Sequence, residues 1–411
     1  MSVIVPPASG NQVSTEPKTP TRPTIDMQKI AALATRAGSM VEQIRGMLLA
    51  PEARKLPPTY STAQLAALCG VDKAHVAYRI TKDDLPAGRL TPSGGKRTFG
   101  LDELRRWTRT YRADKMRPSG AKAMTIAVGN FKGGVAKTTT AMVLAQGLSL
   151  RGHRVLAIDT DPQGSLTTLH GLLPEAEVTE DMTIGPLCEG SESDIRYAIR
   201  STYWDGIDLV AAAPFLFSAE FALPARQMQQ PGAKFWDVLN EGLESVRDLY
   251  DVIIIDTPPS LSYVTINALW AANGIVVPVP PSGLDFASSA QFWSLLADLG
   301  GNLDGQSKDR EGKAFDFLHV LLSRVDAGDP AMPVVRQWIQ ATYGEYTLPV
   351  EIPKTSVTSN KAAEFATVYD VQKYEGAAKT YKRAVDAYDA FVELVEQSVV
   401  GAWSSQLRAA K

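Results

Sequence analysis

The stretch "GNFKGGVAKTTTA", Gly129–Ala141, decides the fold that we expect for this chain of 411 residues. The apolar run "MTIAV" precedes it, and the helical pattern "KTTTAMVLAQGLSLRG" begins inside it. Glycines between a buried strand and a helix let backbone N–H groups, aided by the helix dipole, surround an anion. The lysine at position 137 can reach the phosphates of a nucleotide, and the hydroxyl at position 138 can bind Mg²⁺. The predicted nucleotide contacts are Gly133, Gly134, Val135, Ala136, Lys137, Thr138 and Thr139.

This loop departs from the common pattern G-x-x-x-x-G-K-[ST], whose two glycines would fall on Phe131 and Ala136. What remains is K-G-G-V-A-K-T, with a strand before it, a helix after it and the Lys-Thr pair at the required offset. A chance glycine-rich turn is the alternative, and these three features argue against it. The loop also holds a second lysine, Lys132, although a phosphate-binding loop needs only one.

Downstream of the loop, short apolar runs alternate with helical patterns. The runs predicted as strands are "MTIAVGN", "RVLAIDTDPQG", "YDVIIIDTPPS", "GIVVPVPP" and "FDFLHVLLSRV". Apolar strands of this length between helices indicate an α/β fold, with a mostly parallel, doubly wound sheet covered on both faces, as in P-loop NTPases. Ligands bind such sheets at the carboxyl ends of the strands, where the phosphate loop would lie. A long amphipathic helix, "KTYKRAVDAYDAFVELVEQSVVGAWSSQL", follows the last predicted strand.

Three aspartates lie at the carboxyl ends of these predicted strands. Asp256 ends a strand and is predicted to hold Mg²⁺ through water. Asp159 and Asp161 are two residues apart on a strand, so their side chains should point the same way. Asp159 is predicted to support the metal ion. A single aspartate at a strand end is more often a turn or helix cap, and the phosphate loop is the reason to prefer the metal interpretation.

The residues before position 120 form a separate pattern. Ser61 or Thr62 can cap a short helix that Gly70 ends in a left-handed turn, and Asp72 can cap a second helix. The stretch "GRLTPSGGKRTFGLDELRRW" then predicts a strand, a Ser-Gly-Gly turn, a strand and a helix. Together these elements predict a small α-rich winged helix-turn-helix domain that binds DNA, over residues 58–118. Its predicted DNA contacts are Lys73, His75, Arg79, Lys96 and Arg97. A small protein-binding helical domain is the alternative.

Two segments precede this domain. Residues 1–25 are rich in Pro, Ser and Thr and are predicted to be disordered. Residues 26–50 are predicted to form an amphipathic helix, because apolar residues recur at steps of three and four. The stripe consists of Met27, Ile30, Ala34, Ala37, Val41, Ile44 and Leu48. Such a stripe could be a dimer contact or could pack on its own domain.

Charge and composition narrow the class of protein. The net charge of −3 hides an asymmetry, because residues 1–120 carry +9 and the remainder carries −12. A basic module suggests a nucleic-acid partner, with a merely solvated basic surface as the alternative. Cys69 and Cys188 lack a CxxC spacing, which argues against a disulfide framework or zinc site and fits a reducing cytoplasm. We expect no signal peptide and no membrane span, since neither pattern is present.

Three motifs, in this order, resemble those of the ParA/MinD family of deviant Walker A ATPases. They are residues 132–140, "DTDPQGS" at 159–165 and "IIIDTPPS" at 253–260. The resemblance covers roughly residues 122–400 and implies hydrolysis of ATP with Mg²⁺. The predicted domain in front resembles that of the longer plasmid-type ParA proteins, which repress their own operon. Ala136 departs from the glycine most common at its position in the family.

The resemblance also implies roles for single residues. Lys132 matches the signature lysine, which reaches across a homodimer interface to the nucleotide of the other subunit. Asp161 matches the residue that orients the attacking water, so the predicted catalytic residues are Lys132, Lys137 and Asp161. Pro353, in "PVEIPKTSVTSNKAAEF", is expected near the adenine. Candidates for contact with non-specific DNA are Arg324, Arg336, Lys354 and Lys361, with solvated surface charge as the alternative.

The function implied by the resemblance is that of a DNA partition ATPase, cytoplasmic and nucleoid-associated. It would dimerise with ATP, bind DNA without sequence preference and hydrolyse ATP when a ParB-type centromere-binding partner stimulates it. Without ATP, the front domain would bind an operator. A MinD-type membrane-cycling ATPase is the alternative, but only Arg408 and Lys411 supply positive charge near the end of the last helix. A nitrogenase-type iron protein would need cluster-ligating cysteines that Cys69 and Cys188 do not provide.

Overall fold

The computed structural model describes residues 26–48, 55–82, 84–91, 94–229, 232–304, 313–354, 366–371 and 376–409. The chain divides into two units, Met1–Arg54 and Lys55–Lys411. In the first unit, α1 (Met27–Leu48) is one helix of 22 residues, and its side chains from 27 to 40 are exposed. A helix is thus present within residues 26–50, where the sequence predicts one, while its dimer contact stays a prediction. The predicted disorder of residues 1–25 concerns a segment outside the described residues.

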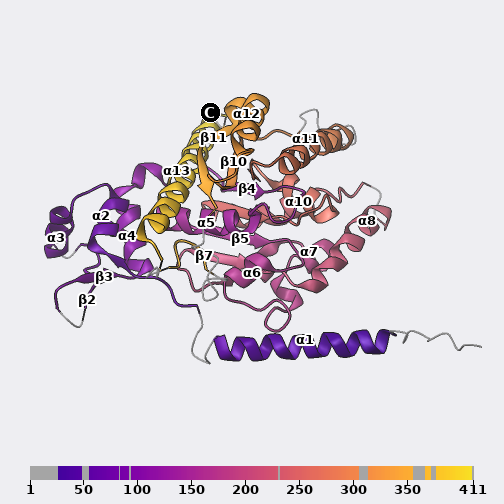
Figure 1. Ribbon diagram of the computed structural model, residues 1–411, viewed down its shortest axis with the longest axis horizontal. Helices are drawn as coiled ribbons and strands as arrows, with labels where there is room; N and C mark the ends of the chain where they lie inside the picture. Colours follow the sequence, from indigo (N-terminus) through magenta and orange to yellow (C-terminus); the bar gives the residue numbers. More distant parts are fainter. Residues whose placement is uncertain are drawn as a thin grey trace, which may run out of the picture. The chain divides into compact units, whose positions relative to one another are not determined.

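The second unit is built on a sheet with the strand order β11-β10-β9-β4-β8-β5-β7-β6 over the described residues (Figure 1). Neighbouring strands are parallel, except that β6 runs antiparallel to β7. The strands are β4 (Met124–Val128), β5 (Val155–Asp159), β6 (Arg200–Ser201), β7 (Ile207–Val210), β8 (Val252–Asp256), β9 (Gly274–Val279), β10 (Phe317–Val325) and β11 (Thr347–Pro353). The five strands expected from the sequence are present, and β6, β7 and β11 are additional.

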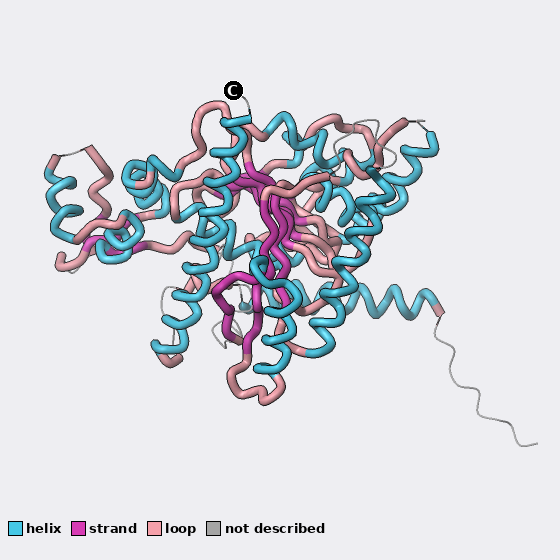
Figure 2. The backbone as a smooth tube through the Cα atoms, turned by 90° about the horizontal axis from the view of Figure 1, so that it is seen from above, coloured by secondary structure: helices cyan, strands magenta, loops and turns pink. Residues whose placement is uncertain are grey.

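Helices cover both faces of this sheet, which confirms the doubly wound arrangement (Figure 2). Alternate residues of β4 show the division, because Ile126 and Val128 join one core while Ala127 joins the other. One face carries α5 (Lys137–Leu150), α6 (Ser165–Leu169) and α13 (Ala378–Ala409). The other carries α7 (Gly185–Glu189), α8 (Ala219–Gln229), α9 (Val238–Leu243), α10 (Tyr263–Ala271), α11 (Gly283–Asp304) and α12 (Met332–Tyr343).

The long helix α13 is part of the core. Its apolar stripe, including Phe391, Val395 and Trp403, is buried. Gly147 in α5 leaves room for the close approach of α13, because a Cβ at this position would lie 2.6 Å from Val392 Cγ2. The apolar face of α13 therefore packs within the protein. None of the described helices combines the length and the apolar composition required to cross a bilayer.

Residues 60–111 form a small α/β region whose helices begin and end where the sequence predicts. It contains β1 (Tyr60–Ser61), α2 (Thr62–Cys69), α3 (Lys73–Thr81), β2 (Arg89–Leu90), β3 (Arg97–Phe99) and α4 (Leu101–Tyr111). Ser61 Oγ accepts from Gln64 N, Gly70 ends α2 with a φ of 67°, and Asp72 caps α3. Both β1 and β2 pair antiparallel with β3, and the pairing of β1 was not expected.

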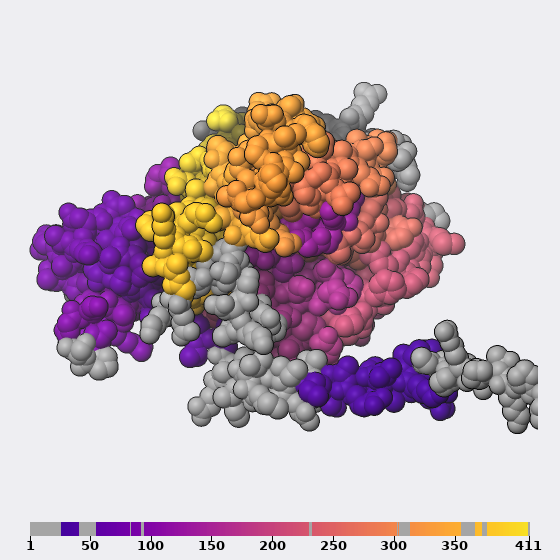
Figure 3. Space-filling view, viewed as in Figure 1, coloured from indigo at the N-terminus to yellow at the C-terminus, as the bar shows by residue number. Residues whose placement is uncertain are grey.

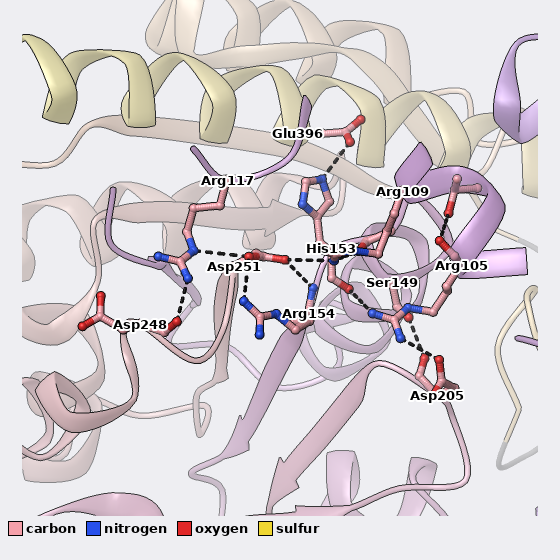
Figure 4. Close-up of polar contacts among 12 residues, drawn as sticks. Arg105, Arg109, Arg117, Ser149, His153, Arg154, Asp205, Asp248, Asp251 and Glu396 are labelled. Carbon is pink, nitrogen blue, oxygen red and sulfur yellow. Dashed lines mark hydrogen bonds and ion pairs between the residues drawn. The ribbon is translucent and has the colours of Figure 1, made fainter. Parts of the chain in front are cut away.

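Helix α4 attaches this front region to the end of α5 (Figure 4). Arg109 Nη1 donates to Gly152 O at 2.5 Å, and Arg105 Nη2 donates to His153 O at 3.1 Å. Arg105 also lies 2.6 Å from Asp205. Figure 3 shows α13, in yellow, between the front region and the orange segment that carries α12. The front region and the sheet therefore form one packed body, joined beside the last turn of the helix that starts at the phosphate loop.

Two buried carboxylates strengthen this attachment (Figure 4). Glu396 on α13 lies 2.8 Å from His153 Nε2 and 2.5 Å from Arg112 Nη2. Asp251, which immediately precedes β8, accepts from Arg117 Nε at 3.2 Å and from the backbone N–H of Arg154 at 2.8 Å. Both carboxylates thus end up ion-paired with arginines from the segment that follows or includes α4.

Candidate functional site

The phosphate loop lies between β4 and α5, at the carboxyl edge of the sheet. Gly134 and Ala136 both have left-handed backbones, with φ of 76° and 74°. Ala136 is the residue before the first turn of α5, and Thr138 and Thr139 lie in that turn, half-buried. Gly133 and Gly134 are exposed. The loop therefore has the strand–loop–helix form that presents N–H groups to an anion.

The two lysines of the loop occupy different environments. Lys137 is only 7% exposed, and its Nζ donates to the carbonyl oxygen of Lys132 at 2.8 Å. Burial lowers the pKa of Lys137, and the charges of Asp256 and Asp161 partly oppose that shift. Lys132 Nζ instead lies 2.6 Å from Asp285 Oδ1, with 34% of the Lys132 side chain exposed. Lys137 is thus inside the site, and Lys132 lies at its rim.

Asp256, the last residue of β8, is the most unusual carboxylate of the site. It is 1% exposed, and neither of its oxygens is in normal hydrogen-bond geometry with a described residue, although the Thr138 hydroxyl lies near enough to act on its pKa. Burial raises its pKa well above the usual value, and the charge of Asp159 adds to the rise, while Thr138 and Lys137 lower it. Buried polar groups normally find partners, so an unpaired carboxylate next to a phosphate loop is suited to binding a cation.

Asp159 and Asp161 differ from Asp256 in their contacts. Asp159 Oδ2 accepts from the N–H and the hydroxyl of Thr167, each at 2.8 Å, and its Oδ1 accepts from Asp161 N. Burial raises the pKa of Asp159 to about 7. Because β5 ends at Asp159, Asp161 lies beyond the strand, and the alternation argument for two side chains pointing the same way does not apply. Asp161 Oδ1 accepts from Gln163 N at 3.0 Å.

These residues can hold Mg²⁺ in the way that nucleotide sites usually do. The described residues contain no cluster of three or more His, Cys, Asp or Glu side chains that could bind a metal alone. Mg²⁺ commonly takes one or two protein oxygens, several waters and the phosphates of its nucleotide. The Thr138 hydroxyl and the Asp256 carboxylate are the side chains available for this, whereas Asp159 already accepts three hydrogen bonds.

A cleft of about 370 Å³ opens beside the loop, within the size range of small-molecule sites. It is lined by Lys132, Gly133, Gly134, Pro280, Pro281, Ser282, Asp285, Arg324, Asp326, Asp329, Met332 and Lys354. Pro353, the expected adenine neighbour, is half-buried at the end of β11 and is not among the lining residues, although the next residue is. No sequence motif indicated Asp285, whose contact with Lys132 depends on the first turn of α11, about 150 residues further along the chain.

The predicted contacts to non-specific DNA have specific partners. Arg336 is held by both oxygens of Glu351, at 2.6 and 2.7 Å. Lys354 lies 3.1 Å from Asp326. Arg324 instead contacts the phosphate loop, where its Nη1 donates to Gly134 O at 2.5 Å. Lys361 is outside the described residues.

The predicted contacts of the front region fall into two groups. Lys73 and Lys96 are exposed. His75 Nε2 lies 2.6 Å from the hydroxyl of Tyr111, and Arg79 donates to the same hydroxyl while pairing with Asp84. Arg97 Nη1 donates to Ala87 O. The structure therefore places His75 and Arg79 in a polar network of the front region.

The sequence of this chain is similar to those of several known proteins. A family model described as an AAA domain matches residues 123–303. A putative replication protein A of Sinorhizobium fredii is 31% identical over 87% of this chain and 90% of its own length. The chromosome-partitioning ATPase Soj of Thermus thermophilus is 30% identical over 66% of this chain and 98% of its own length. The chain belongs to the ParA/Soj/SopA family of partition ATPases.

Two solved structures are similar to this ParA-family chain. A partition protein superimposes with a TM-score of 0.63 over 91% of this chain and 99% of its own, at 19% identity, which supports the fold. The cobyrinic acid a,c-diamide synthase of Mycobacterium smegmatis, with bound ADP and magnesium, covers 66% of this chain and 93% of its own, at 27% identity and a TM-score of 0.50. This ParA-family chain is thus a P-loop ATPase with a small additional region in front.

Proposed function

We propose that this partition ATPase binds Mg²⁺ and ATP in the cleft and dimerises around the nucleotide. The ATP-bound dimer binds DNA without sequence preference, and a ParB-type partner bound to a centromere stimulates hydrolysis and release. The observation that carries this proposal is the position of Lys132. Its own loop already has Lys137 beside the phosphate cradle, whereas Lys132 lies at the rim, partly exposed and paired with Asp285.

The roles of the other residues follow from their positions. The N–H groups of the loop and Lys137 would hold the phosphates, with Thr138 and Asp256 at the metal and Asp161 placed to orient water. Mg²⁺, when bound, would neutralise charge that develops on the phosphates. A second lysine contributed by the partner adds positive charge at the same place, as an arginine finger does. Hydrolysis would then require a closed dimer, so the ParB-type protein could control when ATP is hydrolysed.

The front region supports a role in operator binding. Its two capped helices and hairpin match the order of a winged helix-turn-helix, and residues 1–120 carry a net charge of +9. Lys73 and Lys96 would meet phosphates, while the Tyr111 network would fix His75 and Arg79 on α3. Repression of its own operon is the expected consequence. Arg336, Lys354 and Lys361 remain proposed contacts of the ATP-bound dimer with non-specific DNA, in a cytoplasmic, nucleoid-associated protein.

A mixture of two inactive variants tests the proposal. Lys132→Ala should bind ATP, because Lys137 and the backbone cradle remain, but should lose about 10³–10⁵-fold in hydrolysis. Asp161→Ala should also bind ATP and fail to hydrolyse it, because its water is not oriented. In a mixed dimer, one site combines an intact Asp161 with a Lys132 from the partner. ATP turnover should therefore return in proportion to the fraction of mixed dimers.

Lys122→Ala is the matched control, because this lysine is exposed and lies before β4, at the opposite edge of the sheet. It should hydrolyse ATP at the unmodified rate. If mixed dimers are demonstrated by mass and no activity returns, Lys132 does not act across the interface, and the proposal of an active site shared between subunits fails.

A further inference from the structure

The end of β10 holds an irregularity directly beside the phosphate loop. Its pairing with β11 shifts between Leu322 and Val325, so that three steps along β10 match only two along β11. Such a bulge turns side chains away from their normal alternation. Ser323 and Arg324 lie inside it. On a regular strand these consecutive residues would point to opposite faces, and here both contact the same loop.

The two side chains bind consecutive carbonyl groups of the loop. Arg324 Nη1 donates to Gly134 O at 2.5 Å, and the buried Ser323 hydroxyl donates to Val135 O at 2.9 Å. In a trans peptide the C=O of one residue and the N–H of the next point in opposite directions. Holding these two carbonyls on the β10 side therefore turns the N–H groups of Val135 and Ala136 to the other side of the loop.

The backbone of Arg324 shows that this contact has a cost. Its φ is +52°, and Arg324 and Ala136 are the two non-glycine residues with positive φ in the described part of the chain. A side chain in this region is disfavoured, so residues held there usually cluster at functional sites. Both of these residues border the same loop. Among the described residues no acidic side chain forms an ion pair with Arg324, whereas Arg336 pairs with Glu351.

We infer that Ser323 and Arg324 are positioning residues for the phosphates of the nucleotide. They orient two N–H donors of the loop before the nucleotide arrives, so that binding does not have to reorganise them. The inference rests on the proposed nucleotide site, and it assigns Arg324 to that site and not to a DNA surface. Arg324→Gly would relieve the backbone strain and also remove the hydrogen bond from the Arg324 side chain to the loop. Relief of strain changes the stability of the protein, whereas loss of the hydrogen bond changes its affinity for ADP, so the two effects are measured separately.

Calorimetric titration of monomeric protein with ADP and Mg²⁺ tests the inference. Arg324→Gly should bind ADP about tenfold more weakly, the loss expected for one hydrogen bond from a charged donor. Its unfolding temperature without nucleotide should be equal to or above that of the unmodified protein, because the strained φ is relieved. Arg324→Lys should recover part of the affinity, since its ammonium can still donate. The ratio of ADP to GDP affinity should not change, because the clamp acts on phosphates common to both.

Arg196→Ala is the matched control, an exposed arginine held by Asp194 far from the loop, and it should bind ADP normally. ADP affinity of Arg324→Gly within twofold of the unmodified protein would overturn the inference, as would a changed ADP-to-GDP ratio, which would place Arg324 on the base. If the unmodified protein does not bind ADP, the proposed function itself has failed. That outcome is distinct, because these measurements need neither dimerisation nor hydrolysis.

Discussion

The two ends of β8 carry buried aspartates in opposite surroundings. Asp251, just before the strand, is 2% exposed, and Asp256, its last residue, is 1% exposed. Asp251 accepts hydrogen bonds from Arg117 and from the backbone of Arg154 and lies 3.6 Å from Arg109. Neither oxygen of Asp256 is in normal hydrogen-bond geometry with a described residue. One strand thus presents the same chemical group once satisfied and once unsatisfied.

The different surroundings of Asp251 and Asp256 show that burial alone does not identify a functional acid. A buried carboxylate stabilises a fold when its charge is paired and its oxygens accept hydrogen bonds. At the amino end of β8 arginines supply this and join the front region to the sheet. At the carboxyl end, where parallel sheets bind ligands, we expect Mg²⁺ to pair with the carboxylate of Asp256.

Neutralising each aspartate should give the largest and most divergent effects. Asp251→Asn should destabilise the fold by about 2–3 kcal/mol, less than for a fully buried pair, because Arg109 and Arg154 remain partly exposed. Asp256→Asn should leave stability unchanged or raise it, because it removes an unpaired buried carboxylate, and should lower ATP hydrolysis by about 10–100-fold. Chemical denaturation and steady-state turnover measure the two effects.

Equal destabilisation by the two substitutions would contradict this contrast, because it would indicate that Asp256 also has a partner that stabilises the fold. Normal hydrolysis by Asp256→Asn would remove it from the metal site. Asp251→Asn must retain turnover per folded molecule for the contrast to hold, since it is remote from the cleft.

Two buried histidines also differ in whether their ring nitrogens have polar partners. His153 Nε2 contacts Glu396, whereas neither ring nitrogen of the buried His170 has a partner in the described part of the chain. Burial, followed by the charge of Lys55, lowers the pKa of His170 to about 3. The unfolded chain therefore takes up a proton below about pH 6.5 that the folded chain does not, and stability is lost as the pH falls from 6.5 towards 3.

His170→Gln should remove this dependence. Between pH 7 and pH 5 the unmodified protein should lose about 2 kcal/mol more stability than the variant, as 1.5 pH units below the unfolded pKa imply. Urea denaturation at the two pH values measures the difference. Parallel losses in both proteins would show that His170 has a polar partner or stays near its ordinary pKa.

The sequence predicted those parts that depend on local patterns. The phosphate loop, the capped helices α2 and α3 and the five expected apolar strands are set by residues close together in the chain, such as Ser61, Gly70 and Asp72. The sequence also placed Lys132, Lys137 and Asp256 at one site, because parallel strands end at one edge.

The remaining features depend on contacts between distant segments. Nothing near Asp251 indicates that Arg117 will reach it, since the two are 134 residues apart. The two-residue strand β6 is too short to form a pattern. The contact of Arg324 with the phosphate loop was not predicted, because it depends on a bulge in β10 that no periodicity reveals.

The contact between Lys132 and Asp285 predicts a moderate effect on dimerisation. Asp285→Asn removes the charge that holds Lys132 within its own subunit, 2.6 Å away. Since a partly exposed pair contributes up to about 1 kcal/mol, the ATP-dependent dimer should associate about three- to fivefold more tightly. Sedimentation with ATP and Mg²⁺ measures this change. Weaker association would mean that Asp285 contributes to the interface.

The smallest expected effect compares Ala136 with Arg324, the two non-glycine residues with positive φ in the described part of the chain. Ala136, at φ 74°, carries the cost of a Cβ in this conformation, and its methyl group has no role that we can identify. Ala136→Gly should therefore stabilise the protein by about 0.5–1 kcal/mol, the strain relieved minus the backbone entropy that glycine adds. ADP affinity should be unchanged or tighter, in contrast to Arg324→Gly, where the same relief of strain removes a side chain in contact with the loop. Thermal unfolding and calorimetric titration of both glycine variants provide the comparison. If Ala136→Gly also weakens ADP about tenfold, loss of rigidity in the loop, and not loss of the guanidinium, explains both results.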